Sequence, residues 1–497
     1  MTEITACRAL RKYDGNEGVS PDSGDVAREY TMTPVSRRLL LVFVLMTVLL
    51  SCAATVRGNQ ATSKARGPMI DLAATGVVQV STEGFLEERF IMPKVVSSQL
   101  KQMTIGENLR LAGWPVSPGD HRTINLTRVS VYAPGASIME IGEHGIREVP
   151  RSTHRHFLGR VDGEAGSGVL VILDPASGNL TGLAVSGGLS YDLVPVANGT
   201  STEVRVIATH ERMIGADPHW ACGGETLDNP PAPRDWIDNA KKHVAVKSGG
   251  PLEAVLAIDT DTELLSQKFD GSTSAATDYI ADLIAAMNVM YSRDLNVSLT
   301  QGTTFLRTAS DPYTVNTNGA ASSYELSEFR SYWGSTYGSV DRALVAMLSG
   351  KSTSSYSASG IAYVGSLCST SYGYSFSKVF KINYLSGDAG LVGHEIGHSF
   401  GSSHTHCYSP PIDTCWNDCG NIPATSCPGG PGTVMSYCHL NGCGSNLLEF
   451  HTRVIDSILD NNLAPATGVC IFPATSAEGV FFDGFEGGGT GAWDGSS

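Results

Sequence analysis

Two patterns of hydrophobic and polar residues divide the sequence. From Thr55 to about Thr209, short stretches either alternate apolar and polar residues, as in Arg128–Tyr132, or run continuously apolar, as in Gly168–Leu173. Gly, Pro and Asn separate these stretches. Short runs bounded by turn-forming residues are typical of β-strands, so this region is predicted to be β-rich.

From Glu253 onward, patterns of strands and helices alternate. Apolar runs predict strands, and apolar residues at helical spacing predict helices. Asp388 favours the N-cap position, so a helix is predicted to begin after it and to end at Gly401. The other predicted elements are strands at Ala254–Ile258, Asn296–Leu299, Arg342–Leu348 and Gly360–Val364, the last at an edge, and helices at Ala275–Tyr291, Tyr324–Trp333 and around Phe450, Val454 and Ile458.

An apolar run at Leu39–Leu50 follows Arg37 and Arg38 and precedes Ser51–Ala54. As a helix it would rise about 18 Å, which is short for a hydrocarbon core of roughly 30 Å. The run therefore favours a signal peptide at 32–53, with 1–31 as an upstream extension, over a membrane anchor. Leu49–Cys52 also resembles a bacterial lipobox, in which Cys52 carries a lipid anchor. The predicted location is extracellular, with a cell-envelope lipoprotein as the alternative.

Composition narrows the functional classes. The 497 residues are 41% hydrophobic, which is enough for a large core and suggests two or three domains. The formal net charge is −15, so the basic stripes that bind nucleic acid or anionic membranes are not expected. His154 and His156 lie among arginines and are predicted to be solvated side chains.

The cysteine count supports export. Cys7 and Cys52 fall before or within the leader, and Cys222 is isolated in the sequence. The remaining eight can form four disulfides, as is common in exported proteins. A structural metal cluster is the alternative, but the spacing lacks paired C-x-x-C motifs. The eight are Cys368, Cys407, Cys415, Cys419, Cys427, Cys438, Cys443 and Cys470.

The chemistry is concentrated between His394 and His404. On a helix, His394 and His398 stand one turn apart on one face, and Glu395 can approach a water held by the same metal. Gly401 can end the helix in a left-handed conformation and turn the chain, so that His404 becomes a third ligand. Three histidines leave a fourth position open, as a catalytic zinc requires. The sequence therefore predicts one catalytic Zn²⁺.

The motif H-E-x-x-H-x-x-G-x-x-H, with Met435 in the later sequence Thr433–Tyr437, resembles the metzincin metallopeptidases. The resemblance implies an α/β (α+β) catalytic domain with a mixed sheet and an active-site helix, in which Met435 forms an apolar floor beneath the histidines. Tyr437 matches the position at which astacins and serralysins place a tyrosine that ligates zinc or stabilises the oxyanion. In metzincins the edge strand holds the substrate backbone.

A second resemblance concerns the β-rich region. His156–Gly163, with Asn179–Leu183 and Leu189–Leu193, is similar to propeptides of adamalysin (reprolysin) peptidases. In such zymogens a propeptide cysteine ligates zinc and blocks catalysis, which implies that role for Cys222; a buried structural thiol is the alternative. Adamalysins usually place Asp directly after the third histidine, whereas this chain has Thr405 and then His406.

These features predict the following domains: propeptide with linker at 54–247, catalytic domain at 248–472 and tail at 473–497. The linker is rich in proline and dotted with basic residues, so activation cleavage is expected between Arg234 and Lys247. The predicted function is a secreted, zinc-dependent endopeptidase of the bacterial reprolysin-like type, made as a zymogen. Its partners would be protein or peptide substrates and its own propeptide as inhibitor. A structural Ca²⁺ stays open as a second cofactor, but no motif in the sequence identifies its ligands.

Two other classes stay open at this stage. One is a catalytically silent adhesion or binding protein that keeps the fold, and the other is a zinc hydrolase with a non-peptide substrate. Retention of Glu395 argues against the silent protein, because a purely structural zinc site needs no general base.

Overall fold

The computed structural model describes residues 67–72, 77–82, 85–196, 203–209, 219–222, 251–316, 319–352, 354–355, 357–420, 425–427, 431–440, 443 and 445–474. The predicted extension, the leader with Cys52, the linker with its cleavage region and residues 475–497 lie outside the described residues. The described residues belong to one compact unit that starts at Arg66. None of their helices is both long and apolar enough to cross a bilayer.

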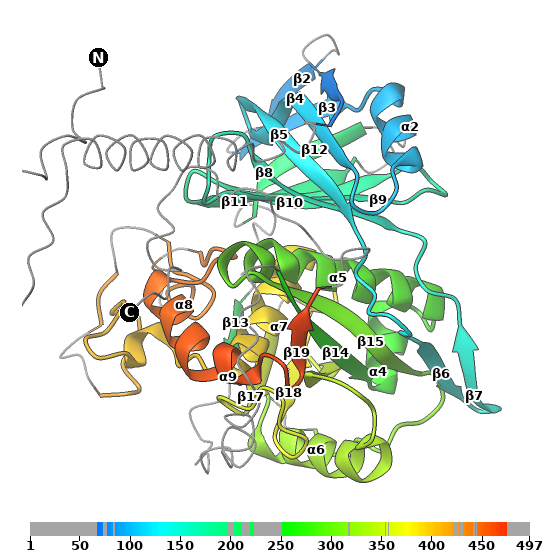
Figure 1. The fold of residues 1–497 in the computed structure, drawn as a ribbon, viewed down its shortest axis with the longest axis vertical. Coiled ribbons are helices and arrows are strands. Elements are labelled where there is room, and N and C mark those ends of the chain that lie inside the picture. The colour runs from blue at the N-terminus through cyan, green and yellow to red at the C-terminus, as the bar shows by residue number, and fades with distance from the viewer. Residues whose placement is uncertain are drawn as a thin grey trace, which may run out of the picture. The chain divides into compact units, whose positions relative to one another are not determined.

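Residues 67–222, here called the N-terminal β segment, are built on a ten-stranded sheet (Figure 1). The strand order is β1-β4-β5-β8-β9-β10-β11-β12-β3-β2, so the β-rich pattern is confirmed. Helix α2 (Lys94–Gln102), which was not predicted, buries Val96 and Leu100 in the core of this sheet. The strands are β1 (Met69–Asp71), β2 (Val77–Thr82), β3 (Phe85–Ile91), β4 (Asn108–Ser117), β5 (Asp120–Val129), β8 (Arg155–Val161), β9 (Gly168–Leu173), β10 (Leu180–Ser186), β11 (Leu189–Pro195) and β12 (Glu203–Ala208).

Strand β9 explains why part of this sheet is apolar on both faces. Successive side chains of a strand point to opposite faces. Val169 and Val171 lie in the core that the sheet shares with α2, whereas Leu170 and Ile172 lie in the core that it shares with residues after 251. The continuous apolar run therefore reflects a strand that is covered on both sides.

Residues 251–474, here called the C-terminal α/β segment, contain a mixed sheet of the order β13-β17-β18-β16-β14-β15-β6-β7, with β19 paired to β14. Its core strands from β18 to β6 are parallel, and β17 is antiparallel to β18. The predicted mixed α/β character is confirmed. The strands are β14 (Leu252–Thr260), β15 (Val297–Arg307), β16 (Leu344–Ser349), β17 (Ser357–Ala362), β18 (Tyr374–Lys378) and β19 (Ile471–Pro473).

Three strands of this second sheet come from the N-terminal β segment. The hairpin β6 (Ile138–Gly142) and β7 (Gly145–Val149) extends it beyond β15, and β13 (His219–Cys222) lies parallel to β17 at the other edge. A strand was predicted at Gly360–Val364 at the edge of the sheet. The strand is present as β17, but its position at the edge was wrong, because β13 pairs with it on its outer side. Residues far apart in sequence thus share one sheet.

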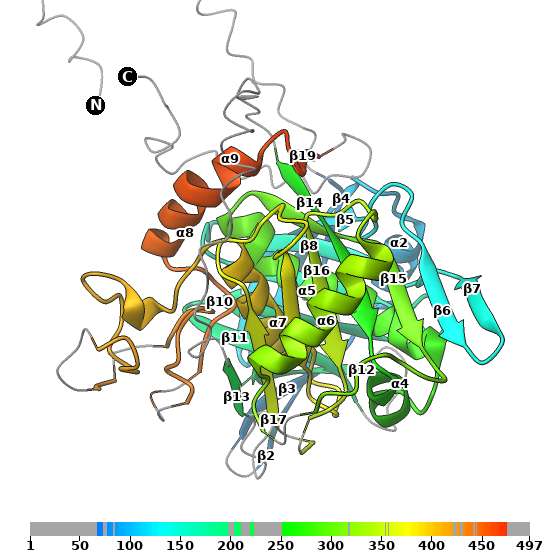
Figure 2. The same cartoon turned by 90° about the horizontal axis from the view of Figure 1, so that it is seen from below.

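The helices lie on both faces of the second sheet. Helices α5 and α7 lie on the face toward the first sheet, and α6 packs on the opposite face (Figures 1 and 2). Helix α5 is apolar around most of its circumference because it lies between the two sheets. The helices are α4 (Thr262–Lys268), α5 (Thr273–Asp294), α6 (Ser323–Tyr337), α7 (Leu385–Ser399), η3 (Thr405–Cys407), α8 (Thr452–Ile458), η4 (Leu459–Leu463) and α9 (Ala464–Ala466).

Helix α7 begins at Leu385, so the prediction that Asp388 caps it was wrong. Asp388 instead lies in the first turn and is fully buried. Its Oδ2 accepts hydrogen bonds from Lys268 Nζ at 3.0 Å and Tyr279 Oη at 2.8 Å, and its Oδ1 accepts one from Phe380 N at 2.9 Å. The carboxylate therefore fixes the start of α7 to α4, α5 and the loop after β18.

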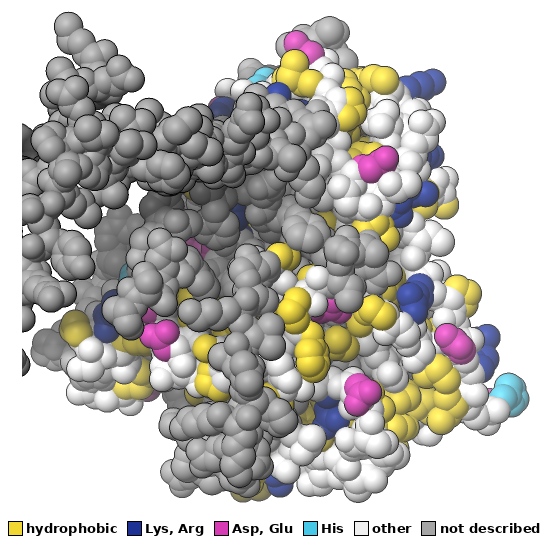
Figure 3. Space-filling view, in the orientation of Figure 1, with side chains coloured by type: hydrophobic (Ala, Val, Ile, Leu, Met, Phe, Trp, Pro, Cys, Tyr) yellow, Lys and Arg dark blue, Asp and Glu magenta, His cyan; other side chains and the backbone are white. Residues whose placement is uncertain are grey.

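Four disulfides form among the eight cysteines of the C-terminal α/β segment, as predicted. They join Cys368 to Cys470, Cys407 to Cys419, Cys415 to Cys438 and Cys427 to Cys443. On the face drawn in Figure 3, the described Lys and Arg side chains are interspersed with Asp and Glu rather than gathered in one patch.

Removing the cation from the buried carboxylate should destabilise the fold. We expect Lys268→Met to lower the free energy of unfolding by about 3 kcal/mol or more, because Asp388 would become a buried charge without its counterion. Urea titration monitored by tryptophan fluorescence would measure the loss. The exposed Lys101→Met is the control and should change stability by less than about 0.5 kcal/mol. Equal stability of both variants would contradict this role for Lys268.

Candidate active site

Helix α7 presents three predicted site residues at one point of the core. His394, Glu395 and His398 are all buried, and none has more than 3% of its surface exposed. The His394 and His398 ring centroids lie 4.6 Å apart, as expected for residues one turn apart. The helix therefore brings both imidazoles to one place.

Gly401 turns the chain so that His404 joins them. Its φ is +104°, a value that L side chains rarely adopt, and a Cβ there would lie 1.8 Å from Asn462 Nδ2. Beyond this turn, His404 Nε2 lies 3.1 Å from His398 Nε2. The ring centroid of His404 is 5.2 Å from that of His394. All three histidines thus converge through their Nε2 sides.

Backbone carbonyls orient two of these rings. His394 Nδ1 lies 2.7 Å from Val434 O, and His398 Nδ1 lies 2.7 Å from Ser402 O. A carbonyl only accepts, so Nδ1 must carry the proton and Nε2 keeps its lone pair. Burial is the main cause that lowers the pKa of His394 and His404 well below the ordinary value and the pKa of His398 to about 4. The three rings are therefore neutral, the form that ligates metals.

Glu395 lies beside strand β17. A Cβ at Gly360 would come within 2.4 Å of Glu395 Cγ, so only glycine leaves room for this carboxylate. Burial raises the pKa of Glu395 well above its ordinary value, although a hydrogen bond from Cys222 acts in the opposite direction. A carboxyl group with a raised pKa can accept and return a proton near neutral pH, as a general base must.

Cys222, at the end of β13, lies in the same cluster. It is the described cysteine outside the four disulfides, and it is buried. Its Sγ lies 3.5 Å from Glu395 Oε2 and 3.6 Å from His398 Nε2. The ligand atoms of Cys222, His394, His398 and His404 all lie within 4.8 Å of one another. Residues separated by more than 170 positions therefore form one compact group.

Met435 and Tyr437 border the cluster. Met435 is fully buried, and its Sδ would lie 2.7 Å from a Cβ at Gly397 of α7. The ring of Tyr437 lies 4.3 Å from that of His404, and its hydroxyl donates a hydrogen bond to Cys222 O at 3.2 Å. Met435 thus lies against the helix that carries the histidines, and Tyr437 reaches the chain that enters the site.

His406 has a different environment from the other three histidines. Its ring stacks on His404 with centroids 5.3 Å apart, and its Nε2 forms a hydrogen bond with Asp418. The structure therefore groups His404, and not His406, with His394 and His398.

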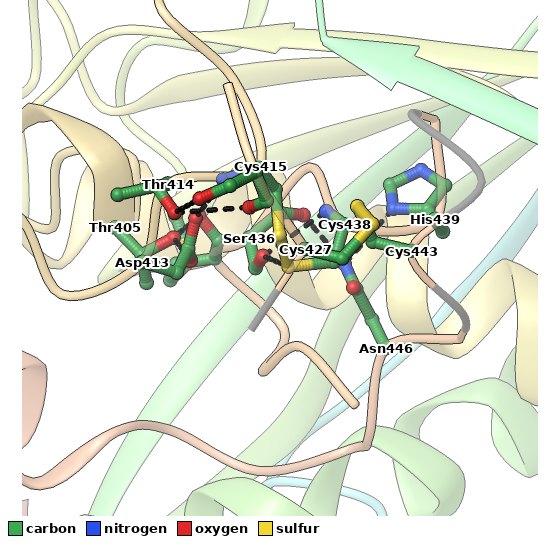
Figure 4. Close-up of a disulfide and its surroundings, with 12 residues drawn as sticks. Thr405, Asp413, Thr414, Cys415, Cys427, Ser436, Cys438, His439, Cys443 and Asn446 are labelled. Carbon is green, nitrogen blue, oxygen red and sulfur yellow. Dashed lines mark hydrogen bonds between the residues drawn. A yellow bond between two sulfur atoms is a disulfide. The ribbon is translucent and has the colours of Figure 1, made fainter. Parts of the chain in front are cut away.

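Disulfides hold the region after the third histidine (Figure 4). Cys415–Cys438 joins the loop to the residue that follows Tyr437, and Cys427–Cys443 joins it to the chain beyond. Thr405 Oγ1 donates to Asp413, and Asn446 Nδ2 donates to Ser436 O. These contacts fix the turn that contains Met435.

The donor set suits zinc. Three neutral imidazole nitrogens and one thiol are the nitrogen and sulfur ligands that Zn²⁺ prefers in a tetrahedral arrangement. Glu395 Oε1 is buried and has no hydrogen-bond partner among the described residues, which is consistent with a group that acts on a bound molecule.

Several positioning groups were not predicted from the sequence. The carbonyls of Val434 and Ser402 carry no side-chain signal, and Gly360 is one of many glycines. Asn462, which meets the turn at Gly401, lies in the late turn η4. A search for glycine in the predicted strand nearest the motif could have found Gly360, but nothing local distinguishes the others.

The comparison with protein-family models supports a metallopeptidase domain. Residues 253–450 match Reprolysin_5, the metallo-peptidase family M12. No curated protein matches the chain. Among solved structures, metalloproteinase-II from Bacteroides fragilis is similar with 13% identity and a TM-score of 0.35, over 69% of this chain and 90% of that chain. A chaperone-substrate complex is similar with 12% identity and a TM-score of 0.28, over 58% of this chain and 40% of that chain.

Metallopeptidases of family M12 use zinc, in agreement with the group of candidate ligands around His394. The family also agrees with the mixed α/β fold of the matched residues. Residues 253–450 are therefore a reprolysin-like metallopeptidase domain of family M12.

Proposed function

We propose that this protein is an exported zinc endopeptidase that is made as a zymogen, with the N-terminal β segment as its propeptide. The observation that carries the proposal is the buried cluster of His394, His398 and His404, with Glu395 and Cys222 in contact with it. The histidines would hold zinc. Bound zinc would supply Lewis acidity toward a water molecule and a peptide carbonyl.

Glu395 would take a proton from the attacking water and return it to the leaving amine. Its position beside Gly360 supports this role, because the carboxylate then lies next to strand β17, against which a peptide can pair. The hydroxyl of Tyr437 would donate a hydrogen bond to the oxygen of the scissile carbonyl. Its present bond to Cys222 O supports that assignment, since it already binds a carbonyl at this place.

Strand β13 supports latency. It pairs in parallel with β17, from His219 beside Ser357 to Cys222 beside Gly360, and so occupies the strand edge that a substrate would use. The thiol of Cys222 would be the fourth zinc ligand and would exclude water from that position. Cleavage between Arg234 and Lys247 would remove the covalent connection between this strand and the C-terminal α/β segment, so that the strand could leave the site.

Export is supported by chemistry as well as by the leader-like sequence. Four disulfides within residues 368–470 suit an oxidising compartment. Digestion of a denatured protein mixture by the cleaved chain, with and without a chelator, tests the overall proposal. Undiminished digestion after removal of zinc, or no digestion at all, would contradict it.

The third ligand can be tested by zinc affinity. We expect His404→Ala to weaken zinc binding by at least about 100-fold and His406→Ala by no more than about tenfold, because His404 belongs to the cluster of candidate ligands and His406 does not. Competition with a chromophoric chelator would measure both affinities. A larger loss in His406→Ala would overturn the assignment of His404.

The general base can be tested by rate. In chains cleaved within the linker, Glu395→Ala should keep about one zinc per chain and lose at least about 100-fold in peptide hydrolysis, because the proton acceptor is gone. The exposed Glu143→Ala, at the turn of the β6–β7 hairpin, is the control and should keep wild-type activity. Normal hydrolysis by Glu395→Ala would remove this residue from the mechanism.

Latency can be tested on intact chains. Cys222→Ser should give measurable hydrolysis of a fluorogenic peptide without cleavage, because serine is a weaker zinc ligand than a thiolate. The cobalt-substituted wild type should show a thiolate absorption band that the variant lacks. Full activity of the intact wild type, together with a spectrum without that band, would show that Cys222 does not cause latency.

A further inference from the structure

The N-terminal β segment is attached to the C-terminal α/β segment by more than the linker. Strand β6 pairs with β15 from Ile138 beside Thr304 to Ile141 beside Arg307. Leu158 of β8, Leu170 of β9 and Leu183 of β10 lie in the same apolar core as helix α5. Cutting the linker breaks none of these contacts, so the two segments have a reason to stay together after cleavage.

A cluster of histidine and aspartate side chains lies within this interface. His156 Nε2 lies 2.8 Å from Asp282 Oδ1, and His154 Nδ1 lies 3.0 Å from the same oxygen. Ser152 Oγ donates to Asp278 Oδ1 at 2.5 Å, and His154 Nε2 lies 3.9 Å from Asp278 Oδ2. Asp278 and Asp282 are one turn apart on α5, so they present both carboxylates to the histidines.

The histidines are not the solvated side chains that the sequence suggested. The side chain of His156 is 3% exposed, that of His154 is 18% exposed and that of Asp282 is 15% exposed. Along β8, Phe157 lies in the core that the first sheet shares with α2, whereas Leu158 lies in the core that it shares with α5. His156 is on the same face of the strand as Leu158, so it points toward α5. Both imidazoles therefore bridge two segments that are far apart in the chain.

Other charged groups also face the cluster. Asp174, at the end of β9, adds a further negative charge near His154. Arg151 lies over the ring of Tyr132, and the Tyr132 hydroxyl accepts from Ser152 N at 2.9 Å. Near the C-terminal end of α5, Arg160 faces Arg293 and Asp294. Burial raises the pKa of Tyr132 to about 12, so the Tyr132 hydroxyl keeps its proton near neutral pH.

His154 therefore sets the response near neutral pH. Burial acts to lower the pKa of His154, but the hydrogen bond and negative charge of Asp282, with Asp278 and Asp174, outweigh burial and raise it. A raised pKa means that binding is strengthened below the ordinary value near 6.5 and that this gain is lost as pH rises through the bound-state pKa. The pKa of Asp282 is lowered by both histidines against the effect of burial, so its contribution is lost only in strong acid.

We propose that His154 and His156, held by Asp278 and Asp282 of helix α5, form a pH-dependent clamp that keeps the N-terminal β segment bound after the linker is cut. The clamp holds in mildly acidic solution and loosens as the His154 imidazole loses its proton, while His156 contributes its contact with Asp282. The partner that fits the α5 surface is thus the chain's own N-terminal fragment. The proposal rests on the proposed latency, since it says when a cut zymogen becomes active.

The test measures fragment release and does not depend on catalysis. A recognition sequence for an added protease, placed between Arg234 and Lys247 in a Glu395→Ala chain, gives a nicked protein that cannot digest itself. Dilution of nicked protein labelled on the N-terminal fragment, followed by anisotropy or size-exclusion chromatography, gives the rate of dissociation. We expect this rate to rise by at least about fivefold from about pH 6 to about pH 8.5, the lower end of ordinary coupling between two sites.

Variants locate the effect in the clamp. The double variant His154→Gln His156→Gln should dissociate faster at about pH 6 and lose most of the pH dependence. Asp282→Asn, which keeps the shape of the side chain, should do the same. The matched control is His121→Gln, because His121 forms an ion pair with Glu88 inside the N-terminal β segment and should keep the full pH dependence. Thermal unfolding of the uncut variants checks that each chain folds.

Two results would overturn the proposal. One is a dissociation rate that is the same at both pH values in the nicked Glu395→Ala chain with all clamp residues present. The other is a pH dependence of that rate that persists in both the double histidine variant and Asp282→Asn. Either result would leave the zinc peptidase proposal untouched, because the test uses an inactive chain, and failure of peptide hydrolysis would likewise leave the dissociation measurement valid.

Discussion

The burial of helix α7 is the constraint on which the rest of the molecule depends. A helix that carries two histidines and a glutamate into a dry core needs a partner for every polar atom that it does not offer to a ligand. The carbonyls of Val434 and Ser402 meet this need for the imidazoles, and Lys268 meets it for Asp388. The turn at Met435 and the preceding helices α4 and α5 are thus tied to the site through α7.

The convergence of His394, His398 and His404 could be predicted from the sequence because its geometry is local. One helix and one glycine turn determine where these side chains lie. The strands of the C-terminal α/β segment and the pairing of eight cysteines could be predicted as well, since apolar runs and residue counts indicate them. The start of α7 could not be predicted, because Asp388 binds the buried Lys268 amine and Tyr279 hydroxyl of α4 and α5 instead of capping the helix.

Contacts between residues that are far apart in the sequence could not be predicted. His154 and His156 looked solvated because their neighbours are arginines, yet their partners lie more than 120 residues away on α5. The β6–β7 hairpin has an ordinary strand pattern, and nothing in it says that it joins the sheet of a later segment. Periodicity tells which face of a strand is buried, but not which partner covers it.

The pairing of β19 with β14 has a consequence for how the chain is made. Ile471 and Pro473 lie beside Ala254 and Leu252, so the last described strand completes the first strand of its segment. A ribosome releases these residues more than 200 positions after β14 has emerged. Until then the beginning of β14 has an open edge on the side that β19 later covers. An open strand edge can pair with another chain, so this part of the sheet is exposed to edge-to-edge aggregation until Ile471–Pro473 has been synthesised.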